Sequence, residues 1–275
     1  MVWYLTTTPS HYIIQLIPAL QPHASLFIPE VPGYGISSSP PTPDKKAIAT
    51  IILEALHQVF PNATSRPLVW CSHDRGARIG HRLLADPPAQ AENIVAALFM
   101  DIVPTLEQWR SFSNPAAAVR YFHWPFLATP FAPKVIEAVG GDKFCRMVLA
   151  AGKGGNEAGV QRLQADGAYD VYAAQFAKAE TIKGSCDDYA DGSVNESQAQ
   201  EREQSEGKKV RVPTLVLYSE GSLAKMHDVE ACWKPWVDGE LTCVGIGESH
   251  GHYFPESAPE VVAEHVLNFL KKVVK

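Results

Sequence analysis

The chain has 275 residues, of which 46% are hydrophobic and 20% are charged. These values suit one large folded domain, or a core domain that carries an insertion. The formal net charge is −6 and no basic stripe is present, so nucleic acid is not an expected partner. The apolar runs are far shorter than the roughly 20 residues that span a bilayer, so no membrane segment is expected.

The cysteines and the first residues of the chain bear on its compartment. Five scattered cysteines, an odd number, fit reduced thiols better than a disulfide framework. The start, Met1-Val2-Trp3-Tyr4-Leu5, lacks the basic stretch and the cleavage site of a signal peptide. We therefore expect a cytoplasmic protein, in which Cys71 and Cys145 fill the core.

Strand-like and helix-like segments alternate along much of the chain, which predicts a mostly parallel α/β sheet. The expected strands are residues 2–6, 25–29, 67–71, 94–102, 214–218 and 241–245, and the expected helices are 11–20, 44–59, 79–85 and 259–272. The alternation stops between about residues 106 and 209. We therefore predict a core of residues 1–105 and 210–275 and a mostly helical cap of residues 106–209, whose polar run 195–209 is the returning linker.

The segment Ser72-His73-Asp74-Arg75-Gly76-Ala77-Arg78 joins an expected strand to an expected helix. Small residues lie two positions before and two positions after Asp74, which is the layout of a nucleophile elbow. Such a sharp turn leaves no room for larger side chains beside its strained central residue. A carboxylate nucleophile attacks carbon and leaves an ester on the enzyme. The motif therefore favours displacement at an alkyl carbon over the chemistry of peptidases and lipases.

This elbow and five other motifs, in order along the chain, resemble the motifs of α/β-hydrolases. Within that superfamily they resemble the motifs of the haloacetate (fluoroacetate) dehalogenases and related epoxide hydrolases. The matching segments are Pro32-Gly33-Tyr34-Gly35, His73 to Arg78, Met100-Asp101-Ile102-Val103-Pro104-Thr105, Phe122-His123-Trp124, Cys186-Asp187-Asp188-Tyr189 and Gly251-His252-Tyr253-Phe254-Pro255-Glu256. The resemblance implies an α/β-hydrolase fold with a helical cap insertion and a small-molecule substrate. No cofactor and no metal is expected.

Hydrolysis of an ester on Asp74 requires a general base near pH 7, for which histidine is the usual choice. The resemblance implies that this base is His252, and His250, two residues earlier, is the alternative. A histidine base also needs an acid that fixes its tautomer. In many α/β-hydrolases this acid follows the strand that corresponds to residues 214–218, but that segment here continues Ser219-Glu220-Gly221-Ser222.

No aspartate stands at that position, and this favours Asp101, at the end of the preceding strand, as the acid partner of the histidine. An acid at that strand end is similar to the dehalogenase arrangement. An aspartate at a strand end is also typical of a loop or helix cap. Glu220 and Asp228 remain the reserve acids.

Arg75 and Arg78 flank the predicted nucleophile, with no obvious counter-charge nearby in the sequence. The planar guanidinium suits bidentate binding of a carboxylate, so the pair predicts a 2-substituted carboxylic acid as substrate. The alternative is that either arginine pairs with a structural acid. The set His123, Trp124 and Tyr189 resembles a halide pocket, in which N–H and O–H donors stabilise the leaving anion. Each residue alone is more typical of a core.

The amino-terminal segment departs from the family pattern. Such hydrolases begin with two further strands and carry a His-Gly-x-Pro turn, whose backbone N–H contributes to the oxyanion hole. The corresponding turn here is Thr6-Thr7-Thr8-Pro9, and we expect the backbone N–H groups of Thr8 and Arg75 to form the hole. The N-terminal strands are thus expected to be shortened or missing, natively or by truncation. Because this would leave a sheet edge bare, a homodimer is also considered.

Two other functions stay open. An epoxide hydrolase would share Asp74, His252 and the acid, and would need two cap tyrosines to protonate the epoxide oxygen. The candidates are Tyr121, Tyr169, Tyr172 and Tyr189. A hydrolase-fold binding protein with little or no catalysis is the other alternative, because the oxyanion turn is altered.

Overall fold

The computed structural model describes the backbone of residues 2–6 and all atoms of residues 14–274. Within these residues six strands form one fully parallel sheet in the order β2-β1-β3-β4-β5-β6. The strands are β1 (Val2–Thr6), β2 (Ser25–Phe27), β3 (Leu68–His73), β4 (Ile94–Met100), β5 (Thr214–Ser219) and β6 (Leu241–Ile246). Each corresponds to a strand predicted from the sequence.

The α-helices fall into those that flank the sheet and those inserted between β4 and β5. The flanking helices are α1 (Ile17–Leu20), α2 (Lys45–Val59), α3 (Arg75–Ala85), α13 (Val229–Trp233), α14 (Phe254–Ser257) and α15 (Pro259–Val273). The inserted helices are α4 (Thr105–Ser111), α5 (Pro115–Arg120), α6 (His123–Leu127), α7 (Ala132–Val139), α8 (Gly141–Gly152), α9 (Glu157–Gln164), α10 (Ala168–Phe176), α11 (Ala179–Ser193) and α12 (Asn195–Ser205). The short 3₁₀ helices are η2 (Pro61–Ser65), η3 (Ala89–Ala91), η4 (Ala165–Gly167), η5 (Leu223–Lys225) and η6 (Lys234–Trp236).

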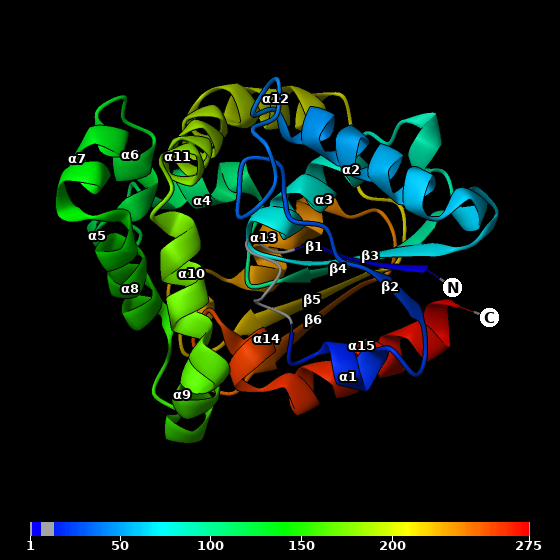
Figure 1. Cartoon of the computed structure of the whole chain (residues 1–275). Helices are drawn as coiled ribbons and strands as arrows, with labels where there is room; N and C mark the ends of the chain where they lie inside the picture. The colour runs from blue at the N-terminus through cyan, green and yellow to red at the C-terminus, as the bar shows by residue number, and fades with distance from the viewer. Residues whose placement is uncertain (1, 7–13, 275) are drawn as a thin grey trace.

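Helices cover both faces of the sheet, as a parallel sheet requires. Successive residues of β3 alternate between two apolar cores. Leu68 and Trp70 pack with α2 and α3, whereas Val69 and Cys71 pack with α1 and α15. Figure 1 shows this layering, with α2 and α3 above the sheet and α1 and α15 below it. Because every residue of β3 is buried, the strand that leads to Asp74 is held on both sides.

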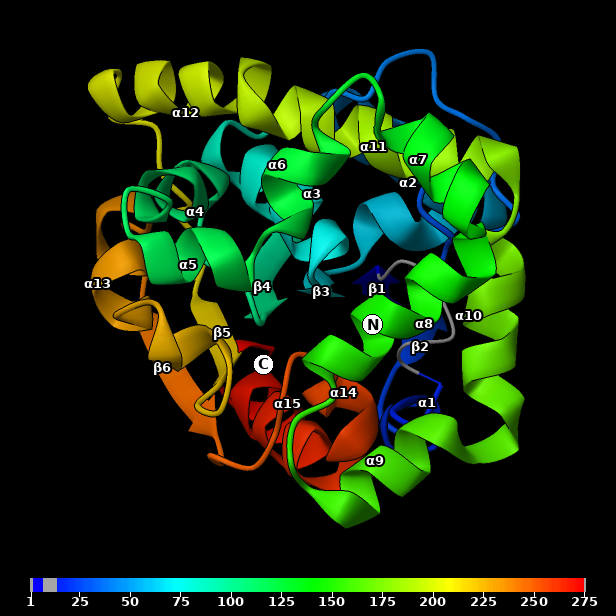
Figure 2. The same cartoon turned by 90° about the vertical axis from the view of Figure 1, so that its left-hand side faces the viewer.

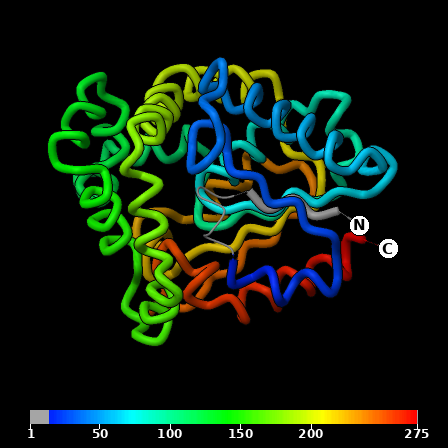
Figure 3. Tube along the Cα trace, viewed as in Figure 1, coloured from blue at the N-terminus to red at the C-terminus, as the bar shows by residue number. Residues whose placement is uncertain are grey.

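The inserted helices lie beyond the carboxyl ends of the strands, where loops of parallel sheets bind ligands. Figure 1 shows α5 to α10 at that end, and Figure 2 views them from outside. The trace in Figure 3 returns to the core along α12, beside α2. The insertion spans the segment predicted as a cap, although the domain boundaries themselves stay a prediction.

Two local predictions require correction. Residues 195–205 form α12 rather than an irregular linker, because ion pairs fix this polar segment against the core helices. Glu196 bonds to Lys45 of α2, and Glu203 bonds to Lys46 of α2 and Arg82 of α3. The helix expected at 11–20 is shorter: α1 covers Ile17–Leu20, residues 14–16 form a turn, and residues 11–13 lie outside the described part. Within the described residues, no helix has the length and hydrophobicity needed to cross a bilayer.

Candidate active site

The predicted elbow is a sharp turn between β3 and α3. Asp74 has φ 46° and ψ −114°, and Arg75 opens the helix. A non-glycine residue at positive φ costs on the order of 1–3 kcal/mol, which the surrounding structure must offset. The Asp74 N–H donates to the carbonyl of Met100 at 3.2 Å, which fixes the turn to the neighbouring strand. The carboxylate is thereby displayed above the sheet, at the floor of a cavity.

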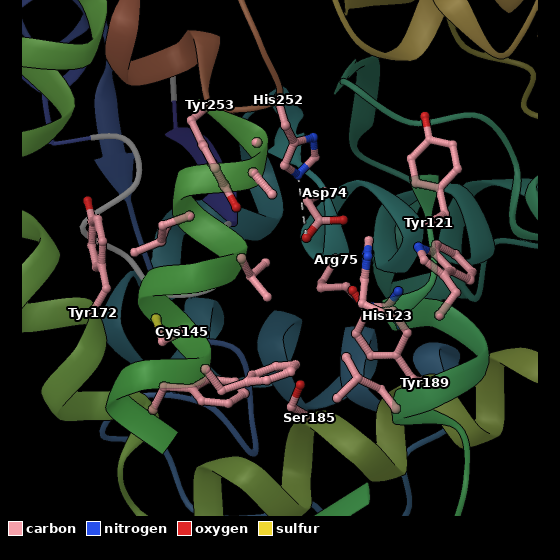
Figure 4. Close-up of a pocket in the computed structure, with 18 of the residues that line it drawn as sticks. Asp74, Arg75, Tyr121, His123, Cys145, Tyr172, Ser185, Tyr189, His252 and Tyr253 are labelled. Carbon is pink, nitrogen blue, oxygen red and sulfur yellow. Dashed lines mark ion pairs between the residues drawn. The ribbon is translucent and has the colours of Figure 1, made fainter. Parts of the chain in front are cut away.

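His252 and Asp101 form a hydrogen-bonded pair beside Asp74. Nδ1 of His252 donates to Oδ2 of Asp101 at 2.7 Å. The other oxygen, Oδ1, accepts from the N–H and the hydroxyl of Ser219, each at 2.7 Å. This bonding turns Nε2 of His252 toward Asp74, whose Oδ2 lies 3.8 Å away (Figure 4). Asp101 also has a positive φ, 53°, so both carboxylates occupy strained turns at strand ends.

The charges of this group shift its pKa values. Burial raises the pKa of Asp74, but the charges of His252 and Arg75 outweigh burial and hold that pKa well below its usual range. Burial lowers the pKa of His252, yet the hydrogen bond to Asp101 and the charges of both carboxylates raise it to about 10. At neutral pH these shifts favour an ionised Asp74 and a protonated His252.

His73, for which the sequence predicted no role, contacts His252 through a hydrogen bond and through its ring. Burial, followed by the charge of His252, lowers the pKa of His73 to about 4, so its imidazole is neutral at pH 7. Its Nε2–H donates to the carbonyl oxygen of His252 at 2.9 Å, and the two ring centroids lie 4.5 Å apart. The position directly before Asp74 was the only sequence signal for this role.

Other predicted partners of Asp74 lie elsewhere. His250 contacts the hydroxyl of Ser257 at 3.3 Å, outside the cavity lining. Asp228 caps α13 by accepting from the N–H of Ala231, and the side chain of Glu220 packs where Gly245 leaves room for it. The geometry therefore favours His252 and Asp101 over the alternatives. Thr8 lies outside the described residues.

Arg75 has the counter-charge that was not visible in the sequence. Its Nε donates to Oδ2 of Asp188 on α11 at 2.5 Å. The same carboxylate accepts from the hydroxyl of Tyr34 at 2.7 Å and pairs with Lys45 at 3.0 Å. Burial raises the pKa of Asp188, but the charges of Arg75 and Lys45 outweigh it and hold that pKa well below its usual range. The structural pairing considered as an alternative thus exists for Arg75, although its Nη1 has no hydrogen-bond partner among the described residues.

Among the described residues, the hydrogen-bond partners of Arg78 are neutral oxygens. Its Nη1 donates to the carbonyl of Val103 at 3.0 Å and to the hydroxyl of Thr105 at 3.3 Å. In the described part of the chain, its Nε has no acceptor. Burial, and then the charge of Arg75, lowers the pKa of Arg78 to about 10, so it stays charged at pH 7. Both arginines therefore bring positive charge to the cavity, and Asp188 neutralises this charge only in part.

The three residues predicted to bind a leaving group come together against these arginines. The ring centroids of His123 and Tyr189 lie 5.9 Å apart, and those of Trp124 and Tyr189 5.4 Å apart. The guanidinium carbon of Arg75 lies 4.2 Å from the Tyr189 centroid, and that of Arg78 lies 4.4 Å from the Trp124 centroid. Such stacking fixes the guanidinium planes. Burial lowers the pKa of His123 to about 4, so the ring is neutral.

These side chains share a cavity of about 560 Å³. Figure 4 shows Asp74, Arg75, His123, Tyr189 and His252 around one end of it. Of the four tyrosines considered for an epoxide hydrolase, Tyr121, Tyr172 and Tyr189 line the cavity and Tyr169 does not. Tyr253 lines it as well, although the sequence did not single it out.

Known proteins with this architecture carry more than one name. A candidate acyltransferase from Salmonella enterica superposes with a TM-score of 0.86 at 24% identity, covering 99% of this chain and 88% of that one, and the other relatives described here are named as hydrolases. The chain is 25% identical to a fluoroacetate dehalogenase from Burkholderia sp over 277 residues, which cover 94% of this chain and 83% of that protein. A candidate α/β-hydrolase from Nostoc sp superposes with a TM-score of 0.82 at 24% identity, covering 98% of this chain and 90% of that one. The chain has the α/β-hydrolase fold.

A second solved structure adds an enzyme class to this resemblance. A candidate epoxide hydrolase from Pseudomonas aeruginosa, with bound MFA, superposes with a TM-score of 0.84 at 26% identity, covering 98% of this chain and 88% of that one. No protein-family model matches. This α/β-hydrolase is thus an enzyme related to dehalogenases and epoxide hydrolases, which weighs against a purely binding role.

We expect Asp188→Asn to lower the free energy of unfolding of this hydrolase by about 3–5 kcal/mol. The amide would leave Lys45 and Arg75 buried without the carboxylate that they share. Asp187→Asn is the matched control, because that neighbouring carboxylate is half-exposed and its one ion pair with a described residue is with Lys183 along the same helix. Its loss should cost less than about 1 kcal/mol. Urea denaturation of both variants measures the difference, and equal losses would contradict the role of Asp188.

We also expect Asp74→Asn to lower the pKa of His252, because it removes one of the two carboxylates that raise this pKa to about 10. The imidazole should then begin to lose its proton at lower pH, toward the ordinary value of about 6.5. NMR titration of ¹⁵N-labelled histidines measures the change. His250 is the internal control, since it contacts Ser257 and should not respond. An unchanged His252 titration would show that Asp74 does not act on this ring.

Proposed function

We propose that the chain hydrolyses the carbon–halogen bond of 2-halo carboxylic acids through an ester on Asp74. The observation that carries the proposal is the pair of buried guanidinium groups that line the cavity beside Asp74, of which only Arg75 forms an ion pair with a carboxylate among the described residues. A substrate carboxylate supplies two oxygens of the required charge. The dehalogenase named among the relatives supports the same reaction class.

In the first step the ionised carboxylate of Asp74 attacks the carbon that bears the halogen. Arg75 and Arg78 hold the substrate carboxylate, so the neighbouring carbon faces Asp74. An oxygen–carbon bond forms, the carbon–halogen bond breaks, and its electron pair leaves with the halide. The N–H groups of His123 and Trp124 and the hydroxyl of Tyr189 are the donors for that anion.

In the second step water hydrolyses the ester, and the charge change at Asp74 prepares the base. As long as Asp74 is ionised, it stabilises the protonated form of His252. Esterification neutralises this carboxylate, so the pKa of His252 falls and its Nε2 becomes able to accept a proton from water. The water oxygen bonds to the carboxyl carbon of Asp74 while its proton passes to Nε2 of His252. The ester carbon–oxygen bond then breaks, the hydroxy acid leaves with a proton from His252, and the carboxyl group of Asp74 releases its proton to restore the carboxylate. Asp101 stabilises the imidazolium that forms, and the backbone N–H groups of Arg75 and Thr8 are the proposed oxyanion donors.

Hydrolysis of an epoxide is the second candidate, because two tyrosines flank the same cavity. The ring of His123 lies 6.4 Å from that of Tyr121 and 5.9 Å from that of Tyr189, between centroids. Two phenols so placed are suited to protonate an epoxide oxygen after attack by Asp74. The charged arginines favour an anionic substrate instead. Incubation with fluoroacetate, chloroacetate and small epoxides, with assays for halide and diol, separates the two candidates.

We expect His252→Gln to accumulate the ester and Asp74→Asn to form none. The glutamine variant keeps the nucleophile and loses the base, so chloroacetate should alkylate it once without turnover. Intact-mass spectrometry followed by peptide mapping should find the adduct on the peptide that contains Asp74. Asp74→Asn should release no halide, provided that deamidation back to aspartate is excluded. Turnover by fresh Asp74→Asn protein would refute the nucleophile.

We expect Arg78→Met to lower kcat/KM for chloroacetate by roughly 30-fold or more, since removing one partner of a buried charge pair costs about 2–5 kcal/mol. The loss for chloroacetamide, which lacks the charge, should be much smaller. Arg78 is the better test than Arg75, because its own bonds are to neutral oxygens and no buried acid is left unpaired. Equal losses on both substrates would make Arg78 structural and favour the epoxide hydrolase.

A further inference from the structure

We propose that the preferred substrates carry an apolar group of several carbons on the reacting carbon, and that an apolar arm of the cavity binds it. This inference rests on the proposed function and deepens it from the reaction to the substrate class. The arm is the part of the cavity lined by helices α8 and α10. Its residues are Phe144, Cys145, Val148, Leu149, Tyr172 and Phe176.

The cavity is larger than a haloacetate requires. The cavity measures about 560 Å³. A water molecule occupies about 30 Å³ of liquid, and a haloacetate displaces only a few waters. Cavities of about 300–1,000 Å³ bind ligands of drug size and enclose most of their surface. A haloacetate bound to Asp74 and the arginines would therefore leave most of this volume to water.

The side chains of the arm are mostly apolar. Phe144 and Cys145 recur one helical turn later as Val148 and Leu149, so one face of α8 is apolar. The rings of Phe144 and Phe176 stack with centroids 5.9 Å apart. Burial raises the pKa of the Cys145 thiol to about 12, so it is neutral. An apolar substituent gains free energy on such a surface, whereas water there lacks partners.

The polar groups of α10 that line the cavity are the amide of Gln175, whose oxygen accepts from Lys178, and the hydroxyl of Tyr172, which a carboxyl group already engages. This hydroxyl lies 3.0 Å and 2.9 Å from the two oxygens of Glu256. Burial raises the pKa of Glu256 to about 8, so this pair carries little charge at pH 7. The arm therefore offers a substituent an uncharged lining.

The arm lies on the side of the cavity where a substituent of the reacting carbon can reach it. Figure 4 shows Cys145 and Tyr172 on the side of the cavity away from Arg75, His123 and Tyr189. With the carboxylate at the arginines, the halide at His123 and attack from Asp74, the reacting carbon has two substituents left. One of them can be directed into the arm. The reaction would be R–CHX–COO⁻ + H₂O → R–CH(OH)–COO⁻ + X⁻ + H⁺, in which R is the apolar group.

The test compares 2-chloropropanoate with 2-chlorohexanoate, because both react at a secondary carbon and differ by three methylenes. Each buried methylene contributes about 0.8 kcal/mol, or about fourfold, so kcat/KM should rise by up to roughly 60-fold. Cys145→Phe places a ring in the arm and should abolish most of this preference. Ala150→Phe, which adds the same ring to the exposed side of α8, should retain it. Thermal unfolding of both variants checks the fold.

The outcomes separate the two proposals. Halide release that does not increase with chain length, or the same preference in Cys145→Phe, would overturn the arm and leave the dehalogenase intact. No halide from any of these acids would overturn the proposed function. In that case the affinities of phenylacetate and acetate, measured by calorimetry, test the arm independently of turnover. Tighter binding of phenylacetate that is lost in Cys145→Phe supports the arm, and equal binding of the two acids overturns it.

Discussion

The buried carboxylate of Asp188 is the interaction on which the site depends. It belongs to α11 of the insertion, yet its three partners belong to the core: Arg75 at the elbow, Lys45 on α2 and Tyr34 in the turn after β2. A buried charge is stable only when it is paired and hydrogen-bonded, so the inserted helices and the core cannot separate without exposing this group or leaving it unpaired. The same contact that holds α11 against the core therefore also orients the arginine beside Asp74.

The charges of two neighbouring carboxylates explain how His252 can be protonated while Asp74 attacks the substrate and act as a base while the ester is hydrolysed. His252 lies between two carboxylates that differ in their remaining partners. Asp101 is fixed by Ser219 and is not alkylated in the proposed cycle, whereas Asp74 loses its charge when it is alkylated. The basicity of His252 would thus depend on the state of Asp74, so that proton transfer from water is favoured only while an ester exists.

The cavity combines a charged end with an apolar one. Around Asp74, guanidinium groups stack on Trp124 and Tyr189, so the aromatic rings that exclude water also fix the cations. Toward α8 and α10 the lining becomes apolar. A site of this kind can hold an ionic group in a defined orientation while the rest of the ligand gains binding energy from burial.

The sequence by itself determined the six parallel strands, the elbow at Asp74 and the candidate residues around it. Alternating apolar segments and small residues at fixed spacing are local features, and local backbone geometry follows from them. The chain also contained the signals for His252 and Asp101, although their roles came from family resemblance. Their contact could not be read from the chain, because 151 positions separate the two residues.

Only the tertiary structure decided which charges are paired. Asp188, Glu196 and Glu203 stand in polar segments that resemble solvated surface, and the fold buries them against Arg75, Lys45 and Arg82. The same ion pairs make residues 195–205 a helix where composition predicted a linker. The free energy of a buried ion pair depends on the distance between the charges and on the removal of water from them. Both are set when the fold brings together residues more than a hundred positions apart, and the local sequence does not encode them.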